Sequence, residues 1–175
     1  MEAKPKKKMV ILGLDNAGKS TILLTLKQQT GIQRFANLKP TAGISTENFE
    51  SQDATYYVWD FGGQEAYRQK YFTKPENFKG TDMLIYVIDI QDAARYEKAL
   101  QYLEKVLDTL QNLTQKSECS VFLHKFDPEI LESEDYKKRS TELRTKLRAL
   151  FKKYPFPLKV FHTSIYTVFQ RIQVM

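Results

Sequence analysis

The 175-residue sequence has little cysteine, tryptophan, histidine or glycine: one, one, two and seven residues, respectively. Cys119 has no partner for an internal disulfide, and its place in an apolar run predicts a buried thiol in a reducing compartment. No segment approaches the roughly 20 consecutive apolar residues that a membrane-spanning helix needs. No apolar run near the N-terminus is typical of a secretory signal. These absences favour a cytoplasmic protein.

The composition is that of a folded domain with a modest basic excess. Apolar residues make up 42% of the chain and aromatic residues 13%, which is enough for one core and argues against disorder. Part of the net charge of +6 lies in Lys4–Lys8, a run that can contact an anionic membrane surface but is more often a solvated end. No basic groove interleaved with aromatic residues stands out, so no nucleic-acid partner is expected. We expect a basic arm at residues 1–8 and one domain over residues 9–175.

Strand and helix patterns alternate along the chain. Strands are predicted at Met9–Gly13, Ile44–Phe49, Ala54–Asp60, Met83–Asp89, Cys119–His124 and Leu158–His162. Helices are predicted around Lys19–Gln29, Ala93–Asn112 and Tyr136–Tyr154, with a short piece from Tyr166, whereas Thr30–Gly43 and Phe61–Thr81 are expected to be irregular. This order predicts an α/β fold: a mostly parallel six-stranded sheet with one antiparallel edge strand and helices on both faces.

A phosphate-binding motif follows the first predicted strand. Residues 13–20 match the pattern G-x-x-x-x-G-K-[ST], with a strand before them and a helix after them. The glycines let backbone N–H groups surround a phosphate, and the helix adds its positive N-terminal end. Lys19 is placed for the terminal phosphates and the Ser20 hydroxyl for Mg²⁺. The loop residues predicted to contact a nucleotide are Asp15, Asn16, Ala17, Gly18, Lys19, Ser20 and Thr21.

A second set of residues is suited to sensing a third phosphate. Asp60, at the end of a predicted strand, is placed to hold Mg²⁺ through a water molecule. The backbone N–H of Gly63 can reach a γ-phosphate, and Gln64 can orient the attacking water. Thr41, in the long loop, offers a second hydroxyl for Mg²⁺ that would hold this loop only when the γ-phosphate is present. A plain turn would also tolerate an aspartate followed by two glycines, so these residues are interpreted together with the first motif.

The residues after the fifth and sixth predicted strands are suited to reading a base. Asp127 can accept hydrogen bonds from N1–H and the 2-amino group of guanine, which adenine lacks. His124 and Lys125 precede it, and the Lys125 stem can lie over the ring. Backbone groups near Ser164 and Ile165 would contact the guanine carbonyl. Taken alone, this His-Lys-x-Asp pattern is equally well explained by a solvated lysine and aspartate pair.

These motifs, in this order, resemble the small GTPases of the Ras superfamily over essentially the whole chain. Residues 12–21 and 59–64, with Pro40 and Thr41, resemble the Arf and Arf-like branch. Residues 71–73 and 84–89, and His124 where most of the superfamily has asparagine, resemble the Rag/Gtr branch. The combination is similar to a deep-branching, for example archaeal, Arf-related protein. The resemblance implies a P-loop NTPase G domain.

The chain departs from these branches at several positions. Glu2 stands where Arf proteins carry a myristoylated glycine, and Ile44 stands where they usually carry phenylalanine, so membrane recruitment by the Arf route is not expected. Rag proteins also carry a second, dimerising domain; this sequence ends about ten residues after Ile165, so that domain is expected either to be absent or to have been removed. Leu38 occupies the position of the switch arginine of G-protein α subunits, and Arg34 is interpreted as a solvated residue. Without an arginine in cis, GTP turnover is expected to be slow.

The function predicted from these patterns is a molecular switch that binds GTP or GDP with Mg²⁺ and slowly hydrolyses GTP. Gln64 and Lys19 are the predicted catalytic residues, and Ser20, Thr41 and Asp60 the predicted Mg²⁺ residues. Predicted partners are an effector, an exchange factor and a GTPase-activating protein, with homo- or heterodimerisation left open. The alternatives are a nucleotide-binding scaffold with negligible hydrolysis and a P-loop ATPase or nucleotide kinase.

Overall fold

The structure is a computed structural model that describes residues 4–26, 38–51 and 53–165. Its strands are β1 (Lys6–Gly13), β2 (Ile44–Glu50), β3 (Thr55–Phe61), β4 (Met83–Asp89), β5 (Glu118–His124) and β6 (Leu158–His162). Its α-helices are α1 (Lys19–Leu26), α3 (Glu65–Tyr71), α4 (Tyr96–Asn112) and α5 (Glu134–Phe151). Short 3-10 helices lie at η1 (Pro75–Phe78), η2 (Ala93–Arg95) and η3 (Pro128–Ile130).

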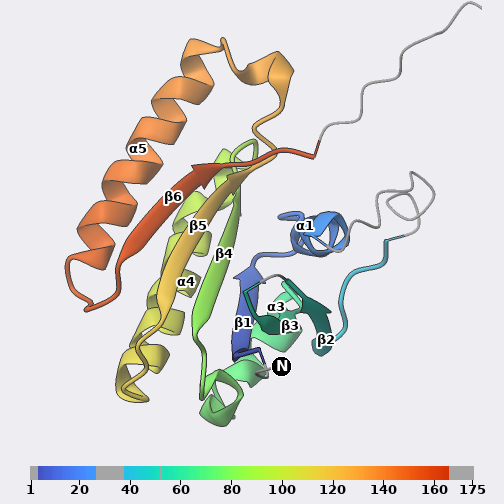
Figure 1. Cartoon of the computed structure of the whole chain (residues 1–175). Coiled ribbons are helices and arrows are strands. Elements are labelled where there is room, and N and C mark those ends of the chain that lie inside the picture. Colours follow the sequence, from blue (N-terminus) through green and yellow to red (C-terminus); the bar gives the residue numbers. More distant parts are fainter. Residues whose placement is uncertain (1–3, 27–37, 52, 166–175) are drawn as a thin grey trace, which may run out of the picture.

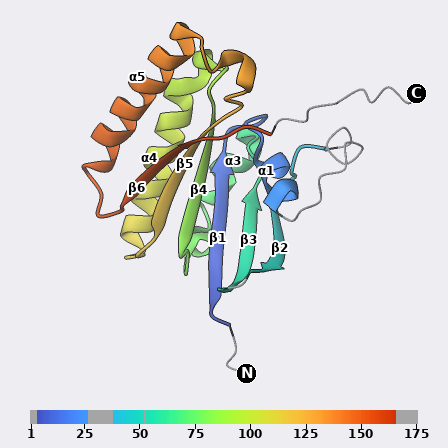
Figure 2. The same cartoon turned by 45° about the horizontal axis from the view of Figure 1, so that its top comes forward.

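The strands form a single six-stranded sheet in the order β2-β3-β1-β4-β5-β6. Strand β2 is antiparallel to β3, and every other neighbouring pair is parallel (Figures 1 and 2). This arrangement confirms the predicted α/β fold, with its mostly parallel sheet and one antiparallel edge strand. The carboxyl ends of the parallel strands therefore meet at one edge, where open α/β sheets bind their ligands.

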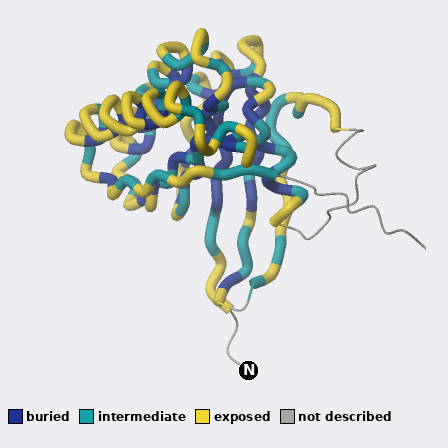
Figure 3. The backbone as a smooth tube through the Cα atoms, turned by 90° about the horizontal axis from the view of Figure 1, so that it is seen from above, coloured by how far each residue is buried: buried dark blue, intermediate teal, exposed yellow. Residues whose placement is uncertain are grey.

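Helices cover both faces of the sheet because side chains alternate along each strand. On β1, Val10 and Leu12 belong to the buried cluster that α4 and α5 cover. The intervening Met9 and Ile11 belong to a second cluster that includes Ile22 and other residues of α1. Figure 3 shows buried residues along the central strands and exposed residues on the outer turns of the helices. The predicted placement of helices on both faces is confirmed.

Strand β1 begins at Lys6, three residues before the predicted start at Met9. Residues 6–8 pair in register with residues 55–57 of β3. The Lys8 ammonium lies 4.0 Å from the centroid of the Trp59 ring and donates to two backbone carbonyl oxygens, of Asn77 and Lys79. The predicted start of the strand at Met9 was therefore wrong by three residues, because backbone pairing continues past the apolar part of the strand.

The segment Phe61–Thr81, expected to be irregular, contains α3 and η1. Its glycines lie outside α3, so they limit the helix without preventing it. Tyr71 and Phe78 are buried and pack on Phe61, with ring centroids 4.8 and 5.2 Å away, respectively. Packing against the sheet thus stabilises a helix that a short charged sequence does not predict.

The other elements agree with the expected ones to within a few residues. Helix α1 is described to Leu26, so the predicted end at Gln29 lies outside the described residues, as do the short piece from Tyr166, most of Thr30–Gly43 and Arg34. Within the part of the chain that the structure describes, no helix is long and apolar enough to cross a bilayer.

Candidate functional site

The loop between β1 and α1 curls around the side chain of its own lysine. Asn16 and Gly18 have positive φ angles of 60° and 94°, which turn the backbone back on itself. The Lys19 ammonium donates to the carbonyl oxygens of Gly13, at 3.2 Å, and Leu14, at 2.9 Å. The loop therefore has the closed shape of a phosphate cradle, with the ammonium at its centre.

Lys19 is 6% exposed, and the burial has an electrostatic consequence. Desolvation lowers the pKa of Lys19 to about 8, while the carboxylates of Asp60 and Asp15 act in the opposite direction. An anion entering the loop would favour the charged form of the ammonium.

Three residues expected to hold Mg²⁺ converge beside this lysine. The hydroxyl oxygens of Ser20 and Thr41 are 3.2 Å apart. Both hydroxyls donate to Oδ2 of Asp60, from 3.2 Å for Ser20 and 2.9 Å for Thr41. Oδ1 of Asp60 is buried and has no hydrogen-bond partner among the described residues.

This oxygen cluster fits a hard divalent cation. Mg²⁺ prefers oxygen ligands and commonly takes only one or two from the protein, leaving the others to water and phosphate. The described residues contain no cluster of three or more carboxylate, histidine or cysteine side chains that could hold a metal by themselves. The two hydroxyls and the unpaired Oδ1 of Asp60 are therefore the groups suited to the ion.

Two glycines bring the segment after β3 into backbone contact with its neighbours. A β-carbon on Gly63 would lie 2.3 Å from the backbone nitrogen of Asp15, and one on Gly62 would lie 2.2 Å from the Thr41 carbonyl oxygen. The Asp15 N–H also donates to the Gly63 carbonyl oxygen at 3.1 Å. Gln64 follows, exposed, immediately before α3. The predicted sensor of a third phosphate is thus attached directly to the phosphate loop.

A cavity of about 380 Å³ opens over these residues. The described residues that line it are Asp15, Asn16, Gly18, Lys19, Ser20, Thr21, Leu38, Lys39, Pro40, Thr41, Gly63, Gln64 and Lys125. Ten of the predicted site residues are in this lining. The other predicted site residues lie outside it: Ala17, Asp60 and His124 are buried, and Asp127, Ser164 and Ile165 follow β5 and β6.

His124, at the end of β5, links the base-reading segment to the phosphate loop. Its ring lies against Gly18, where an added β-carbon would be 2.4 Å from Cδ2. Nδ1 is 2.9 Å from the Thr163 hydroxyl. Lys125 has a φ of 61°, and its ammonium donates to Oδ2 of Asp89 at 2.6 Å. These contacts join the carboxyl ends of β4, β5 and β6 to one another.

Asp127 is held by two side chains from other segments. The Ser164 hydroxyl donates to its Oδ1, and Nε2 of Gln91 donates to its Oδ2 at 3.2 Å. Gln91 also donates to the Lys125 carbonyl oxygen at 2.8 Å. Ile165 is half-buried against the cluster beneath α1. His162, the last residue of β6, stacks on Phe126 with ring centroids 4.2 Å apart.

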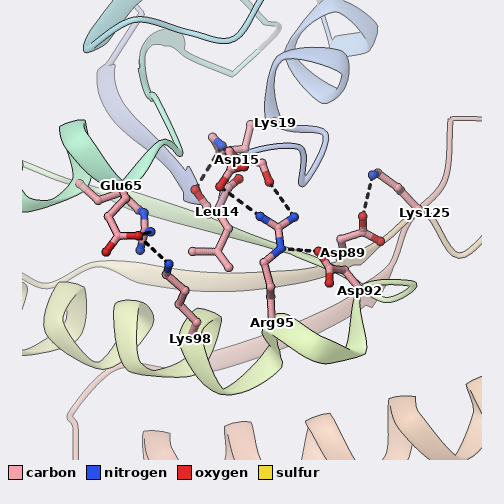
Figure 4. Close-up of polar contacts among 11 residues, drawn as sticks. Leu14, Asp15, Lys19, Glu65, Asp89, Asp92, Arg95, Lys98 and Lys125 are labelled. Atoms are coloured by element: carbon pink, nitrogen blue, oxygen red, sulfur yellow. Dashed lines mark hydrogen bonds and ion pairs between the residues drawn. The ribbon is translucent and has the colours of Figure 1, made fainter.

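The residues that follow β4 are the part of the site that the sequence analysis missed. Asp89, the last residue of β4, pairs with Lys125, and Arg95 contacts Asp15 (Figure 4). Gln91 contacts Asp127. One signal was present in the sequence: β4 is a buried parallel strand, and residues after its carboxyl end must lie at the ligand edge.

Comparison with known proteins identifies the family. The model of the ADP-ribosylation factor (Arf) family matches residues 1–168. The chain belongs to the Arf family. Among curated Arf-family proteins, ADP-ribosylation factor F of Dictyostelium discoideum is 30% identical over 126 residues, covering 72% of this chain and 63% of that protein. Human ADP-ribosylation factor-like protein 4C is 38% identical over 109 residues, covering 59% of this chain and 53% of the relative. The aligned part of this Arf-family chain thus spans between half and two thirds of these relatives.

Solved structures agree with the Arf-family fold. The Arl6 (BBS3) small GTPase of Trypanosoma brucei, with the nucleotide analogue GppNp bound, is 24% identical. Its TM-score is 0.64, and the match covers 90% of this chain and 87% of the Arl6 chain. The mammalian SRP receptor is 14% identical with a TM-score of 0.71, covering 90% of this chain and 91% of that one. At these identities the likeness concerns the G-domain fold alone.

Proposed function

We propose that this Arf-family chain is a guanine-nucleotide-dependent switch. It binds GTP or GDP with Mg²⁺, hydrolyses GTP slowly, and changes the conformation of the loops around Thr41 and Gly63 when the γ-phosphate is lost. These loops would then control the binding of an effector.

The observation that carries this proposal is the convergence of Ser20, Thr41 and Asp60 within 3.2 Å of one another, beside a buried lysine. The three residues come from three separate segments of the chain. These three side chains would hold a Mg²⁺ ion, which would supply positive charge beside the phosphates of a bound nucleotide. Thr41 belongs to the loop before β2, and its hydroxyl would contact the ion only when a γ-phosphate is present.

The preference for guanine is proposed from Asp127. Ser164 and Gln91 hold its carboxylate at the ligand edge of the sheet, and an oriented carboxylate selects for the N1–H and 2-amino donors of guanine. Backbone groups near Ile165 and the Lys125 stem would complete the base site. His124 would contribute by supporting Gly18 of the phosphate loop.

Hydrolysis is proposed to depend on Gln64 and Lys19. Gln64 lines the cavity next to Gly63, where its amide can orient a water for in-line attack. Lys19 would stabilise charge on the phosphates. An activating protein that supplies an arginine would accelerate such a reaction by about 10³–10⁵-fold.

Nucleotide competition tests the binding part of the proposal. GTP should displace a fluorescent guanine nucleotide in the presence of Mg²⁺, whereas ATP should not. Asp127→Asn should abolish this preference, and Glu129→Gln, which changes a neighbouring carboxylate, should retain it. Equal competition by ATP and GTP in the wild-type chain would favour the ATPase or nucleotide kinase alternative instead.

Single-turnover hydrolysis tests the catalytic part. Gln64→Leu should slow GTP hydrolysis while nucleotide affinity is retained. If the wild-type chain binds GTP and hydrolyses it no faster than Gln64→Leu, the chain is better described as a nucleotide-binding scaffold. An exchange factor, an activating protein and an effector are proposed as partners, at a cytoplasmic location.

A further inference from the structure

Asp15 places a negative charge on the loop that would bind phosphates. It is the third residue of the motif, lines the cavity, and has a side chain that is 39% exposed. Its N–H donates to the carbonyl oxygen of Gly63, the residue proposed to meet the γ-phosphate. An unpaired carboxylate at this position would repel a terminal phosphate.

Arg95 pairs with this carboxylate from a different part of the chain. Its Nη1 is 3.1 Å from Oδ1 of Asp15, and its Nη2 donates to the Asp15 carbonyl oxygen at 3.2 Å. Its Nε donates to Asp92, so all three guanidinium nitrogens have partners, as Figure 4 shows. Burial acts to lower the pKa of Arg95, but Asp92 and Asp15 outweigh it and raise the pKa.

The pairing is a product of the fold rather than of local sequence. Arg95 ends η2, which follows β4, whereas Asp15 follows β1. Strands β1 and β4 are parallel neighbours in which Gly13 pairs with Val87, so both carboxyl ends reach the same edge. The ion pair with Asp92, three residues earlier, orients the guanidinium toward the loop.

We propose that Arg95 is a positioning residue that neutralises Asp15 and thereby sets the preference of the site for GTP over GDP. This inference rests on the proposed function. GDP and GTP share the α- and β-phosphates, but only GTP carries a phosphate against Gly63 and hence beside Asp15. Loss of the Arg95 charge should therefore weaken the binding of a GTP analogue more than that of GDP.

A charge role and a purely mechanical role make different predictions. Arg95→Met keeps an unbranched apolar stem but removes the charge, and it should lower the GTP-analogue to GDP affinity ratio by about fivefold to tenfold. Arg95→Lys keeps the charge, so its affinity ratio should stay closer to that of the wild type. Adding Asp15→Asn to Arg95→Met removes the unpaired carboxylate and should restore most of the ratio. If Arg95 only held the loop in place, Arg95→Met would lower the affinity for both nucleotides equally, and adding Asp15→Asn would not restore it.

The experiment measures dissociation constants for GppNHp and GDP by fluorescence competition at constant Mg²⁺. Arg139→Met, which breaks a partly exposed ion pair with Asp135 on α5, is the matched control and should leave the ratio unchanged. Thermal unfolding of each variant shows whether it remains folded. Arg95→Met with an unchanged ratio, or without rescue by Asp15→Asn, would overturn the role of Arg95 alone. A wild-type chain that binds neither nucleotide would overturn the proposed function together with it.

Discussion

The imidazole ring of His124 lies directly against Gly18, so the end of β5 supports the loop between β1 and α1. A β-carbon at Gly18 would be 2.4 Å from Cδ2 and 2.7 Å from Nε2 of His124. Burial, aided by Lys125, lowers the pKa of His124 below its ordinary value of 6.5. The folded protein therefore favours a neutral ring at this contact.

Acid should destabilise the protein in part through His124. As the pH falls below about 6.5, a histidine in the unfolded chain takes up a proton that the folded ring takes up only at lower pH, so the free energy of unfolding falls. Urea unfolding at pH 7.5 and 5.5 should show a smaller pH dependence for His124→Asn than for wild type. The pKa of His162 is also lowered, mainly by burial, so His162→Asn should separately reduce the pH dependence of the free energy of unfolding. An unchanged pH dependence in His124→Asn would contradict this prediction.

Replacing Thr41 should affect GTP more than GDP. Thr41→Ala removes a hydroxyl that lies 2.9 Å from Asp60 and is proposed to meet Mg²⁺ only in the GTP state. The Mg²⁺-dependent affinity for GppNHp should fall by about tenfold or more, and that for GDP should fall much less. Fluorescence competition over a Mg²⁺ series measures both. Thr46→Ala, at an exposed position on β2, is the control and should behave like wild type.

Nucleotide binding should take up a proton at alkaline pH. Since the pKa of Lys19 is about 8 and phosphates favour its charged form, affinity should fall as the pH rises through about 8. Proton uptake should therefore be small at neutral pH and should increase as the pH rises through about 8. Calorimetry in buffers of different ionisation enthalpy measures this directly. The side chain of Lys19→Arg stays charged over the whole pH range. If this variant still binds nucleotide, binding should therefore take up no proton. Proton uptake by this variant would show that another group binds the proton.

Gln91 should support guanine selection without touching the phosphate loop. Gln91→Ala removes donors to Asp127, at 3.2 Å, and to the Lys125 carbonyl oxygen, at 2.8 Å. Because these contacts are exposed, we expect guanine-nucleotide affinity to fall only about twofold to fivefold. The loss should be the same for GDP and GppNHp. Gln111→Ala, at the far end of α4, is the control, and a loss that differed between the two nucleotides would contradict the assigned role.

The sequence predicted those parts of the molecule that depend on patterns of neighbouring residues along the chain. Apolar strands and intervening helices specify a parallel sheet, because consecutive strand–helix–strand units pack with one handedness. The spacing of Gly13, Lys19 and Ser20 likewise places a lysine and a hydroxyl at a helix start. Helix α3 was missed because its short charged sequence has little helix signal before Tyr71 packs on Phe61.

By itself, then, the sequence determined the sheet, the phosphate loop and the chemical types of the residues around it, since those follow from short-range patterns. Only the tertiary structure decided which side chains meet across elements: Arg95 with Asp15, Gln91 with Asp127, and His124 with Gly18. These contacts depend on the register of β1, β4 and β5. A shift of one residue in that register would turn the side chains of the shifted strand, such as His124, to the other face of the sheet, and would displace the loops that carry the other residues.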